Sequence, residues 1–383
     1  MRINSKSILA GMALGALLLT GCNDAEYDTL SNQAYILQTN TNANSSLKLT
    51  VGAEVATTTL NVRLSDVANV ESRYRLVYDT AVVNEYNRLN ETPYVSLPQE
   101  SFSLSSEETT IEAGASVSTP ITLTVPPYNE ALKASGKKYA IGFRLENTSG
   151  NASVLPSGSK IVYILDQVVI QPVVVLDQSH YVSQNLVKNY PLTEWTVEMN
   201  INKHVLYTEV GRGNNQAIFG AGPDEIYIRF GDAPIEGNRL QIKTQGTQMN
   251  SLALFNEHTW YHLAFVCTGT KLYLYVNGQL DNSMDLPGKT TNVNSINICS
   301  PSTYWLGNAM YSEVRFWQRA RSQAEIANNM YACDPTTPGL ITYYKMNEGE
   351  GYSFRDASGN GNNAETNGQA VPEWIQDVRI DGK

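Results

Sequence analysis

The sequence has 383 residues, which is enough for two domains of ordinary size that each bury a core. Charged residues make up 17% of the chain, and its formal net charge is -10. This acidic balance excludes nucleic acid and anionic lipid surfaces as partners attracted by long-range charge.

The N-terminus has the pattern of an exported protein. Two basic residues precede an apolar segment at residues 8–19. The segment closes on Leu19-Thr20-Gly21-Cys22, which resembles a bacterial lipobox. We therefore expect residues 1–22 to be a lipoprotein signal peptide and Cys22 to carry the lipid that anchors the chain to a membrane. A plain signal peptide with a chance cysteine is the alternative.

An acidic tether, residues 23–29, follows Cys22 and contains Asp24, Glu26 and Asp28. This run is similar to the surface-export signal of Bacteroidota lipoproteins. The resemblance implies an outer-membrane lipoprotein that faces the cell exterior. A short solvated tether is the other reading.

Three cysteines remain after Cys22, namely Cys267, Cys299 and Cys333. The number is odd, so at most one disulfide can form within the chain. No two of them have C-x-x-C spacing, and the sequence therefore supports neither a structural zinc site nor a thioredoxin-like site.

Residues 30–166 are predicted to form an Ig-like β-sandwich. Short alternating stretches recur between residues rich in Gly, Pro, Asn and Ser, which is typical of this architecture. The apolar positions are Leu60, Val62, Leu64, Tyr74, Leu76, Tyr78, Ile121, Leu123, Val125, Tyr139, Ile141, Phe143 and Leu145.

The order of short motifs in this region resembles the N-terminal domain of Bacteroidota surface lipoproteins. The motifs are Val77-Tyr78-Asp79, Tyr86-Asn87, Leu97-Pro98, Ile111-Glu112-Ala113-Gly114 and Tyr139-Ala140-Ile141. Proteins of that family sit beside glycan-degradation systems, so the resemblance implies a surface glycan importer and an endoglycosidase as neighbours. It implies a spacer role for residues 30–166, and no site is assigned there.

Residues 167–176 are apolar with one proline, and we expect a strand-like, semi-rigid linker. The second domain, residues 177–383, is organised around a hairpin. Residues 260–267 alternate with apolar side chains on both faces, which predicts a strand inside a layered β structure. A second strand follows at 271–276, and Asn277-Gly278 is a strong two-residue hairpin signal.

This hairpin, with its W-x-H-L and L-Y-V-N-G runs, resembles the centre of the laminin-G-like (concanavalin A-like) jelly roll. Residues 312–317 resemble the E-V-R-I-W strand of that fold, and residues 339–361 resemble its G-L…D-x-S-G-N-G signature. In many relatives this signature opens the domain, whereas here it lies near the end, which suggests either a permuted strand order or extra terminal strands. Ser322 and Glu325 form a capping box that starts a short helix.

Residues for catalysis are not found. Glycosidases are also built on the jelly roll that the chain resembles, and they need two carboxylates on one strand face, as in the E-x-D-x-x-E signature of the family 16 hydrolases. The sequence has no such run. Glu348 and Glu350 fall in a Gly-rich turn, where a structural or solvated role is favoured. His258 and His262 are not followed by a set of metal ligands. We therefore expect a protein that is not an enzyme.

Residues for glycan binding are better supported. Sugar sites on β-sandwiches combine an aromatic platform with amide and carboxylate groups. Tyr304 and Trp305 are the candidate platforms, in a polar loop that also contains Asn308. Asn214 and Asn215 are added from loop position alone. The alternative is that Trp305 folds back over the sandwich.

A calcium ion is the one cofactor that the sequence suggests, and none is required. Asp356, Ser358 and Asn360 alternate oxygen ligands in a Gly-rich turn, which suits a hard cation. The same residues form ordinary Asx turns without a metal, and we favour the turn.

Together these observations predict a glycan-binding surface lipoprotein of a polysaccharide-utilisation system, whose ligand is an oligosaccharide or polysaccharide. Because the lipoprotein family that the chain resembles occurs beside endoglycosidases, the resemblance implies N-glycans or other mannose-rich chains as ligands. The alternative is an adhesin or scaffold that binds a protein partner. A glycoside hydrolase is the weakest reading.

Overall fold

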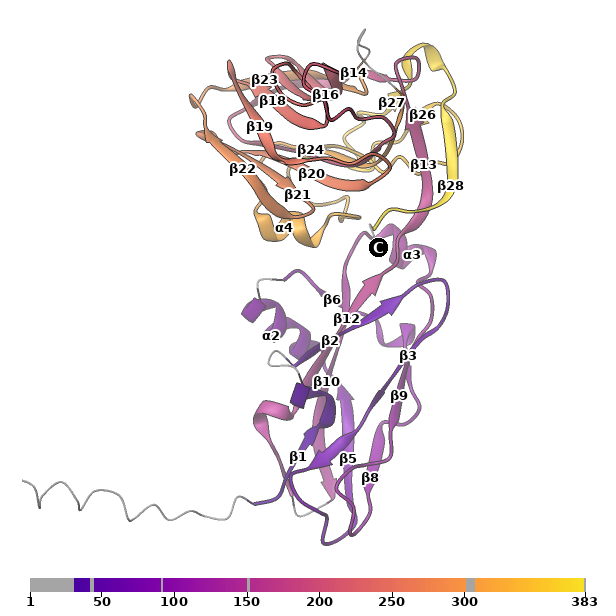
Figure 1. Ribbon diagram of the computed structural model, residues 1–383. Helices are drawn as coiled ribbons and strands as arrows, with labels where there is room; N and C mark the ends of the chain where they lie inside the picture. The colour runs from indigo at the N-terminus through magenta and orange to yellow at the C-terminus, as the bar shows by residue number, and fades with distance from the viewer. Residues whose placement is uncertain (1–30, 42–44, 91, 150–151, 301–306, 382–383) are drawn as a thin grey trace, which may run out of the picture.

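The computed structural model describes residues 31–41, 45–90, 92–149, 152–300 and 307–381, which form two β-rich domains that lie end to end (Figure 1). The signal peptide, Cys22 and the acidic tether expected from the sequence lie outside these residues. Every helix in the described part of the chain is too short or too polar to serve as a membrane-spanning segment.

The N-terminal domain is built from three small sheets around one apolar core, in the manner of a β-sandwich. The first sheet contains β2 (Ser46–Val51), β12 (Lys160–Gln167), β10 (Tyr139–Ser149), β5 (Ser72–Tyr78) and β8 (Glu108–Ile111), with β6 (Val95–Ser96) on β10. The second contains β3 (Ala56–Leu60), β9 (Ile121–Val125) and β7 (Ser103–Leu104). The third contains β11 (Ser153–Val154), β1 (Gln33–Ile36) and β4 (Val62–Leu64).

The apolar positions predicted from strand alternation in this domain are confirmed as core. Tyr74, Leu76 and Phe143 are among the buried residues of the cluster. The longest helix of the domain was not predicted: α2 (Thr80–Asn90), which buries Val82 and Val83 against β10 and β12. The other helical segments are short: η1 (Leu37–Thr41), η2 (Gln99–Ser101), α3 (Glu130–Ala134) and η3 (Pro156–Gly158).

The C-terminal domain is a sandwich of two sheets. The eight-stranded sheet contains, in order, β22 (Gln279–Asp285), β21 (Lys271–Val276), β20 (Trp260–Cys267), β15 (Trp195–Lys203), β24 (Ala309–Trp317), β13 (Ile170–Leu176) and β28 (Glu373–Arg379), with β25 (Leu340–Tyr344) on β24. The six-stranded sheet contains, in order, β14 (Val182–Leu192), β23 (Thr291–Ile298), β16 (Gln216–Pro223), β17 (Ile226–Phe230), β18 (Arg239–Thr244) and β19 (Thr247–Leu254). The smaller elements are α4 (Gln323–Asn328), β26 (Ser353–Phe354), β27 (Ala364–Glu365) and η4 (Asn367–Gln369).

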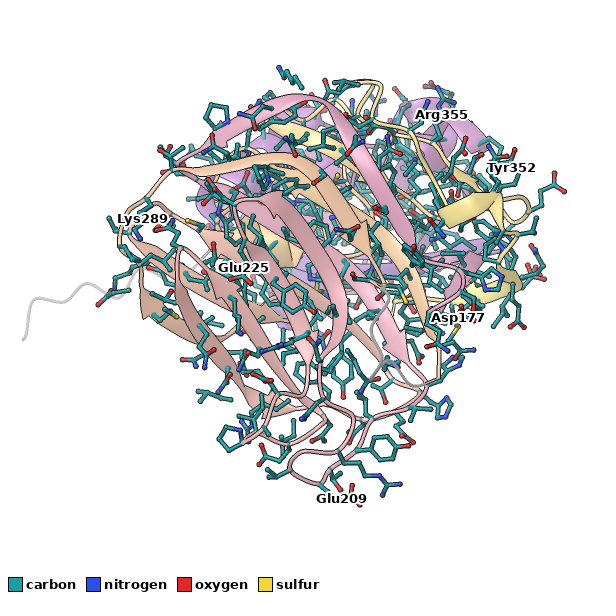
Figure 2. The ribbon with its side chains drawn as sticks, turned by 90° about the horizontal axis from the view of Figure 1, so that it is seen from above. Asp177, Glu209, Glu225, Lys289, Tyr352 and Arg355 are labelled. Carbon is teal, nitrogen blue, oxygen red and sulfur yellow. The ribbon has the colours of Figure 1, made fainter. Side chains whose placement is uncertain are left out.

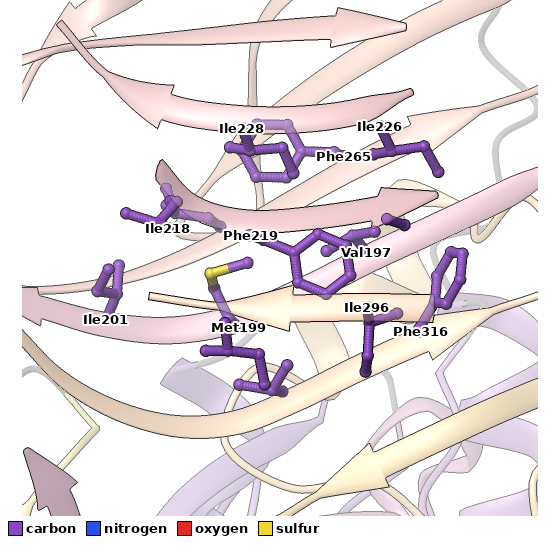
Figure 3. Close-up of a cluster of buried hydrophobic side chains, with 14 of the residues drawn as sticks. Val197, Met199, Ile201, Ile218, Phe219, Ile226, Ile228, Phe265, Ile296 and Phe316 are labelled. Carbon is purple, nitrogen blue, oxygen red and sulfur yellow. The ribbon is translucent and has the colours of Figure 1, made fainter. Parts of the chain in front are cut away.

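The two sheets meet across an apolar core in which β15 and β20 bury every second side chain inward. Val197, Met199, Phe219, Phe265 and Phe316 interdigitate there (Figure 3). Each side chain of this size contributes roughly 1.5–3 kcal/mol when it is fully buried. The six-stranded sheet lies on the side of the domain that is remote from the N-terminal domain, and α4 lies on the near side (Figure 1).

The organising hairpin is confirmed. Strand β20 pairs with β21, and Leu263, Phe265 and Cys267 face the core while Ala264 and Val266 face outward. Asn277 and Gly278 both have positive φ, which is the backbone geometry that a tight hairpin of this type requires. The Ser322–Glu325 capping box is also present, although α4 ends at Asn328.

Two expectations about organisation are refined by the structure. Residues 170–176 of the expected linker 167–176 belong to the eight-stranded sheet as β13, because they pair with both β24 and β28. The signature near the end of the chain provides β25 and the β26–β27 hairpin, while β28 extends the sheet beyond β13. The late position of the signature thus coincides with extra terminal strands.

Candidate functional site

The outer face of the six-stranded sheet is polar from one edge to the other. Residues opposite one another in antiparallel strands point to the same face, so the strand registers define rows across it. The first row crosses the sheet from β14 to β19 as Ser183, Asn297, Gly220, Tyr227, Lys243 and Gln248. The second row crosses from β16 to β19 as Ala217, Arg229, Gln241 and Asn250. Ser183 and Gln248 are exposed and Asn297, Tyr227 and Lys243 are half-buried, whereas Ala217, Arg229 and Gln241 are buried. The first row is therefore the one that offers hydrogen bonds to a hydroxylated ligand.

A gap interrupts the first row at Gly220. A Cβ atom placed there would have as its nearest neighbours the Ile226 carbonyl oxygen and Tyr227 Cδ2, both at 3.8 Å, and Asn297 Nδ2 at 3.9 Å. These are ordinary van der Waals contacts, so the buried backbone at Gly220 leaves room for one added carbon between its neighbours. We call this feature the Gly220 trough: it has a backbone floor, Tyr227 on one side and Asn297 on the other.

Tyr227 is held in place by its neighbours on the face. Its hydroxyl donates a hydrogen bond to Asn215 Oδ1 at 2.7 Å, and the Arg229 guanidinium lies 5.4 Å from the centre of its ring. Burial raises the pKa of the Tyr227 hydroxyl, and the positive charge of Arg229 offsets this only in part. Tyr227 therefore stays protonated and presents a fixed, half-buried aromatic ring beside the trough.

Arg229 is the centre of the polar network on this face. Its guanidinium donates to Asn215 Oδ1 at 2.9 Å, to Asp232 Oδ2 at 2.5 Å and to Gln241 Oε1 at 2.7 Å. Gln241 in turn donates to Asn250 Oδ1 at 3.1 Å. Because these partners fix both the guanidinium and the two amides, the side chains around Tyr227 are already ordered for binding.

Of the binding residues predicted from the sequence, the structure brings Asn215 to this site. Asn215 has a positive φ of 58°, which asparagine tolerates, and its side chain accepts from both Tyr227 and Arg229. Asn214 precedes it, and its Oδ1 is buried without a hydrogen-bond partner among the described residues. Both asparagines lie at the end of the sandwich where β16 begins.

Tyr304 and Trp305 lie outside the described residues, so the predicted platform stays a prediction. The residues that flank this loop are placed. The Ser300 amide donates to the Ala217 carbonyl at 3.0 Å, two residues from Asn215. The Asn308 carbonyl accepts from the His204 amide at 3.0 Å.

Tyr227, Arg229 and Gly220 were not singled out in the sequence. A weak signal was present, because Ile226, Ile228 and Phe230 alternate with Tyr227 and Arg229 over one strand. Alternation places Tyr227 and Arg229 on the outer face, but only the strand order places Gly220 and Asn297 next to them.

Two family models match the chain. A model described as the concanavalin A-like lectin/glucanases superfamily matches residues 177–327, and a model described only as an N-terminal domain matches residues 30–152. The C-terminal domain is a concanavalin A-like domain. A search of curated proteins gave no match.

A comparison with solved structures found similar chains, of which the first described here shares the fold over most of this chain. A candidate carbohydrate binding protein from Bacteroides ovatus is 22% identical with a TM-score of 0.62, and the match covers 91% of this chain and 100% of that one. The Bacteroides thetaiotaomicron EndoBT-3987, solved with a Man5GlcNAc product, is 19% identical over 35% of this chain and 30% of that one, with a TM-score of 0.30. A SAP-like pentraxin from Limulus polyphemus is 14% identical over 40% and 82% of the respective chains, with a TM-score of 0.29.

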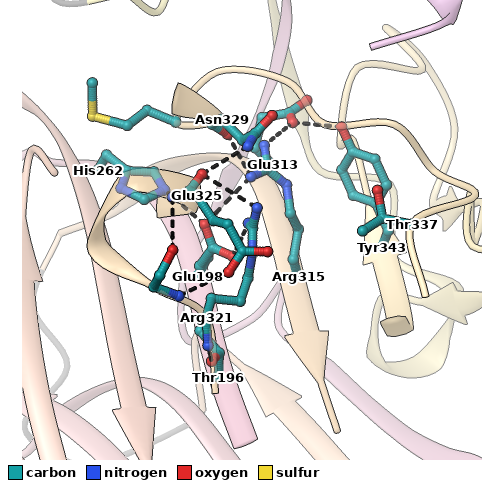
Figure 4. A network of polar contacts seen from close by, with 12 residues as sticks. Thr196, Glu198, His262, Glu313, Arg315, Arg321, Glu325, Asn329, Thr337 and Tyr343 are labelled. Carbon is teal, nitrogen blue, oxygen red and sulfur yellow. Dashed lines mark hydrogen bonds and ion pairs between the residues drawn. The ribbon is translucent and has the colours of Figure 1, made fainter. Parts of the chain in front are cut away.

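The opposite outer face of the concanavalin A-like domain is covered by residues 318–339, which include α4. Beneath this segment lies a buried ionic network centred on Glu198 (Figure 4). Arg321 donates to Glu198 Oε1 at 2.6 Å, Arg315 lies 3.5 Å from Oε2 of the same carboxylate, and His262 lies 3.4 Å from that oxygen. None of these side chains is more than 2% exposed, so this face is closed to ligands.

The charges in this network have shifted pKa values. Burial works to raise the pKa of the Glu198 carboxyl, but Arg321 and His262 outweigh it and the pKa is lowered. Burial lowers the pKa of His262, and the attraction of Glu198 offsets this only in part. Arg315 also pairs with Glu313, whose carboxylate accepts a hydrogen bond from the Tyr343 hydroxyl at 2.5 Å. These carboxylates are therefore structural partners of arginine, without a free oxygen facing solvent.

The turn at Asp356 is held by its own hydrogen bonds. Asp356 Oδ1 accepts from the Tyr343 amide and from the amide and hydroxyl of Ser358, and Oδ2 accepts from the Asn362 amide at 3.0 Å. The Asn360 side chain donates to the Leu340 carbonyl at 2.8 Å. The three candidate metal ligands are thus hydrogen-bonded within an Asx-type turn, and calcium binding there stays a prediction. Among the described residues, no group of three or more His, Cys, Asp or Glu is placed to hold a metal ion.

Cys267, Cys299 and Cys333 are all buried and free in the described part of the chain. Burial raises the pKa of each thiol, to about 11 for Cys333. These cysteines act as packed apolar groups rather than as a reactive site.

Proposed function

We propose that the protein binds glycans, without catalysing a reaction on them, through the outer face of the six-stranded sheet. The observation that carries the proposal is the Gly220 trough, where an ordered tyrosine ring stands beside an open strip of backbone that is bordered by amides. A pyranose ring has apolar faces that pack on an aromatic ring and hydroxyls that bind amides, and the trough offers both. The concanavalin A-like fold and the resemblance to surface lipoproteins support the same reading.

The wider assignment remains a proposal of the same kind. Lipid at Cys22 anchors the chain to the outer membrane, facing the exterior. The N-terminal domain is then a spacer that presents the glycan-binding domain to a surface importer and an endoglycosidase. N-glycans and other mannose-rich chains are the first ligands to test. Tyr304 and Trp305 add a second platform at the Asn215 end of the face, and calcium at Asp356 is an optional ligand.

The test uses the chain from Asn23 to Lys383 on a glycan panel, with Tyr227→Ala beside the wild type. We expect the wild type to bind at least one glycan and Tyr227→Ala to weaken that binding about tenfold or more, as for other central binding residues. Tyr227→Phe keeps the ring and loses only the hydrogen bond to Asn215, so a smaller loss is expected. Tyr86→Ala is the control, because Tyr86 is a half-buried tyrosine on α2 of the other domain.

Three further readouts sharpen this test. Adding calcium or a chelator shows whether binding needs the ion, and Trp305→Ala tests the second platform. New reducing ends after incubation with a bound glycan would make the protein a hydrolase and contradict the proposal. The proposal would also be contradicted if the folded wild type bound no glycan of the panel.

An adhesin that binds a protein is the second candidate, because one apolar patch favours it. Leu252 on β19 and Leu280 on β22 are 67% and 50% exposed. They lie close together, since the Leu252 amide donates to the side chain of Asp281 at 2.8 Å. Loss of binding to a host or bacterial protein in Leu252→Ser, with Tyr227→Ala unaffected, would support this alternative.

A further inference from the structure

A second hollow lies at the β14 edge of the six-stranded sheet. It encloses about 700 Å³ between β14, the β26–β27 hairpin and η4. Most of its lining residues carry polar side chains, among them Ser183, Gln184, Glu348, Arg355, Asn363 and Glu365. Figure 2 shows Arg355 to one side of the sheet, whereas Glu225 lies over it.

The hollow is continuous with the row that contains the Gly220 trough. Ser183 lines the hollow and is paired with Asn297, the residue that borders the trough. From Tyr227 on β17 to Ser183 on β14 the row crosses three strand spacings, about 14 Å in all. A pyranose ring is about as wide as one strand spacing, so a linear chain of about four sugars reaches from Tyr227 into the hollow.

The side chains of the hollow are arranged for hydrogen bonding rather than for stacking. Glu348 Oε1 accepts from the Arg355 amide at 3.0 Å, which fixes the carboxylate and leaves Oε2 for another donor. Asn363 Oδ1 accepts from the Asp356 amide at 2.9 Å, which leaves its NH₂ group facing other acceptors. The Arg355 side chain is exposed, lines the hollow together with Glu348 and Glu365, and forms no ion pair with any described residue. Burial raises the pKa of Glu348.

We propose that this hollow is a distal sugar subsite, which binds the far end of a neutral, linear oligosaccharide whose near end lies in the Gly220 trough. The proposal rests on glycan binding at the trough. Sugar hydroxyls donate to Glu348 and Glu365 and accept from Arg355 and Asn363. The absence of an exposed aromatic ring among the lining residues makes the subsite dependent on hydroxyls alone.

The charge of the hollow selects against acidic sugars. Two carboxylates and one guanidinium line it, so its net charge is negative, and the chain as a whole carries -10. A uronic or sialic acid there would place like charges together in a partly desolvated site. Neutral hexoses carry no such penalty.

The experiment measures affinity against chain length. The probes are manno-, cello- and malto-oligosaccharides of one to six units, with oligogalacturonates of the same lengths as the acidic series, all titrated calorimetrically. For the neutral series that binds, we expect the affinity to rise up to about four units and then level off. The oligogalacturonates are expected to bind at least tenfold more weakly than neutral chains of the same length.

Variants separate the two subsites. Arg355→Ala is expected to lose the gain between three and five units, about fivefold to tenfold, while shorter probes bind as they do to the wild type. The double variant Glu348→Gln, Glu365→Gln should reduce the difference in affinity between neutral chains and oligogalacturonates of the same length. Arg88→Ala on α2 is the matched control, an exposed arginine of the other domain, and should bind every probe like the wild type.

The two proposals fail in different ways. If the wild type binds none of the probes, glycan binding at the trough is contradicted and the distal subsite falls with it. If the wild type binds but its affinity does not change beyond two units, or if Arg355→Ala behaves like the wild type at all lengths, only the distal subsite is overturned. Preference for oligogalacturonates would contradict the assignment to neutral chains.

Discussion

The two outer faces of the concanavalin A-like domain are both polar, but only one of them is covered. On the eight-stranded sheet, Glu198, Arg315 and Arg321 neutralise one another beneath residues 318–339. On the six-stranded sheet, Arg229 is neutralised by Asp232 while Tyr227 and Asn297 remain accessible. The same chemistry of arginine, carboxylate and amide therefore serves stability on one face and is available for recognition on the other. What decides the role is whether a chain segment lies on top.

The largest expected effect comes from breaking the covered face. Arg315→Ala removes the partner of Glu313 and leaves its carboxylate buried without a compensating charge. We expect the free energy of unfolding of the C-terminal domain to fall by about 3–5 kcal/mol, because an uncompensated buried charge is costly. Chemical denaturation measures this.

Arg73→Ala is the control for this prediction. Arg73 pairs with Glu71 at the surface of the N-terminal domain, at 2.8 Å and with its side chain 57% exposed. An exposed pair of this kind contributes about 0–1 kcal/mol. Equal effects of the two substitutions would mean that the covered network is not what stabilises this face.

A smaller effect is expected from filling the open face. Gly220 does not have a positive φ, and an added Cβ atom would be in ordinary van der Waals contact at 3.8–3.9 Å, so a side chain can start from this backbone without strain. The added methyl groups occupy the trough between Tyr227 and Asn297. We expect binding of the best glycan of the panel to weaken about tenfold, or ~1.4 kcal/mol.

Stability distinguishes this loss from misfolding. The free energy of unfolding of Gly220→Val should change by less than about 1 kcal/mol, since valine suits a strand. Gly220→Ala, which adds a single carbon, should give an intermediate loss of affinity. Undiminished binding by Gly220→Val would place the glycan elsewhere on the domain.

The smallest effect is a pH dependence of the covered face. The pKa of His262 is lowered from its ordinary 6.5, so below about pH 6.5 the unfolded chain takes up a proton that the folded chain does not. The contribution of His262 to the free energy of unfolding is therefore fully present above pH 6.5 and decreases as the pH falls below that value. Below 4.5 the lowered pKa of Glu198 adds a further loss in the same direction.

His262→Gln isolates the first part of this dependence. Between pH 6.5 and 5 the wild type should lose stability more steeply than the variant, by at most about 1.4 kcal/mol per pH unit. Measuring the free energy of unfolding of both proteins across this range gives the difference, to which the other histidines contribute equally. Parallel pH profiles would show that His262 does not titrate differently in the folded state.

The sequence predicted those features that are encoded locally. The two strands at residues 260–267 and 271–276 follow from alternation, the turn after them follows from Asn277-Gly278, and the capping box at Ser322 follows from four residues. The helix α2 was missed because its valines and asparagines are weak helix formers, and it is stabilised by packing on β10 and β12.

The candidate site was only partly predictable for a related reason. Asn215 was selected from its loop, whereas Gly220, Tyr227 and Asn297 come from three strands, and Asn297 is 70 residues from Tyr227 in the sequence. They become neighbours only through the order β23-β16-β17, which no local pattern specifies. Glu348 was noticed in its Gly-rich turn, but its position beside Ser183 depends on the β26–β27 hairpin lying against β14.

The placement of the six-stranded sheet on the side remote from the N-terminal domain has a consequence for access. The segment that covers the other face approaches the N-terminal domain, where Asp334 lies 4.0 Å from Lys137 and the Cys333 carbonyl packs against Gly136. The joint between the domains is thus made on the closed side. For a chain held at its N-terminal end, the outer face of the six-stranded sheet then points away from the point of attachment. A long polymer can therefore bind along this face without entering the space between the domains. No movement of one domain relative to the other is needed for binding.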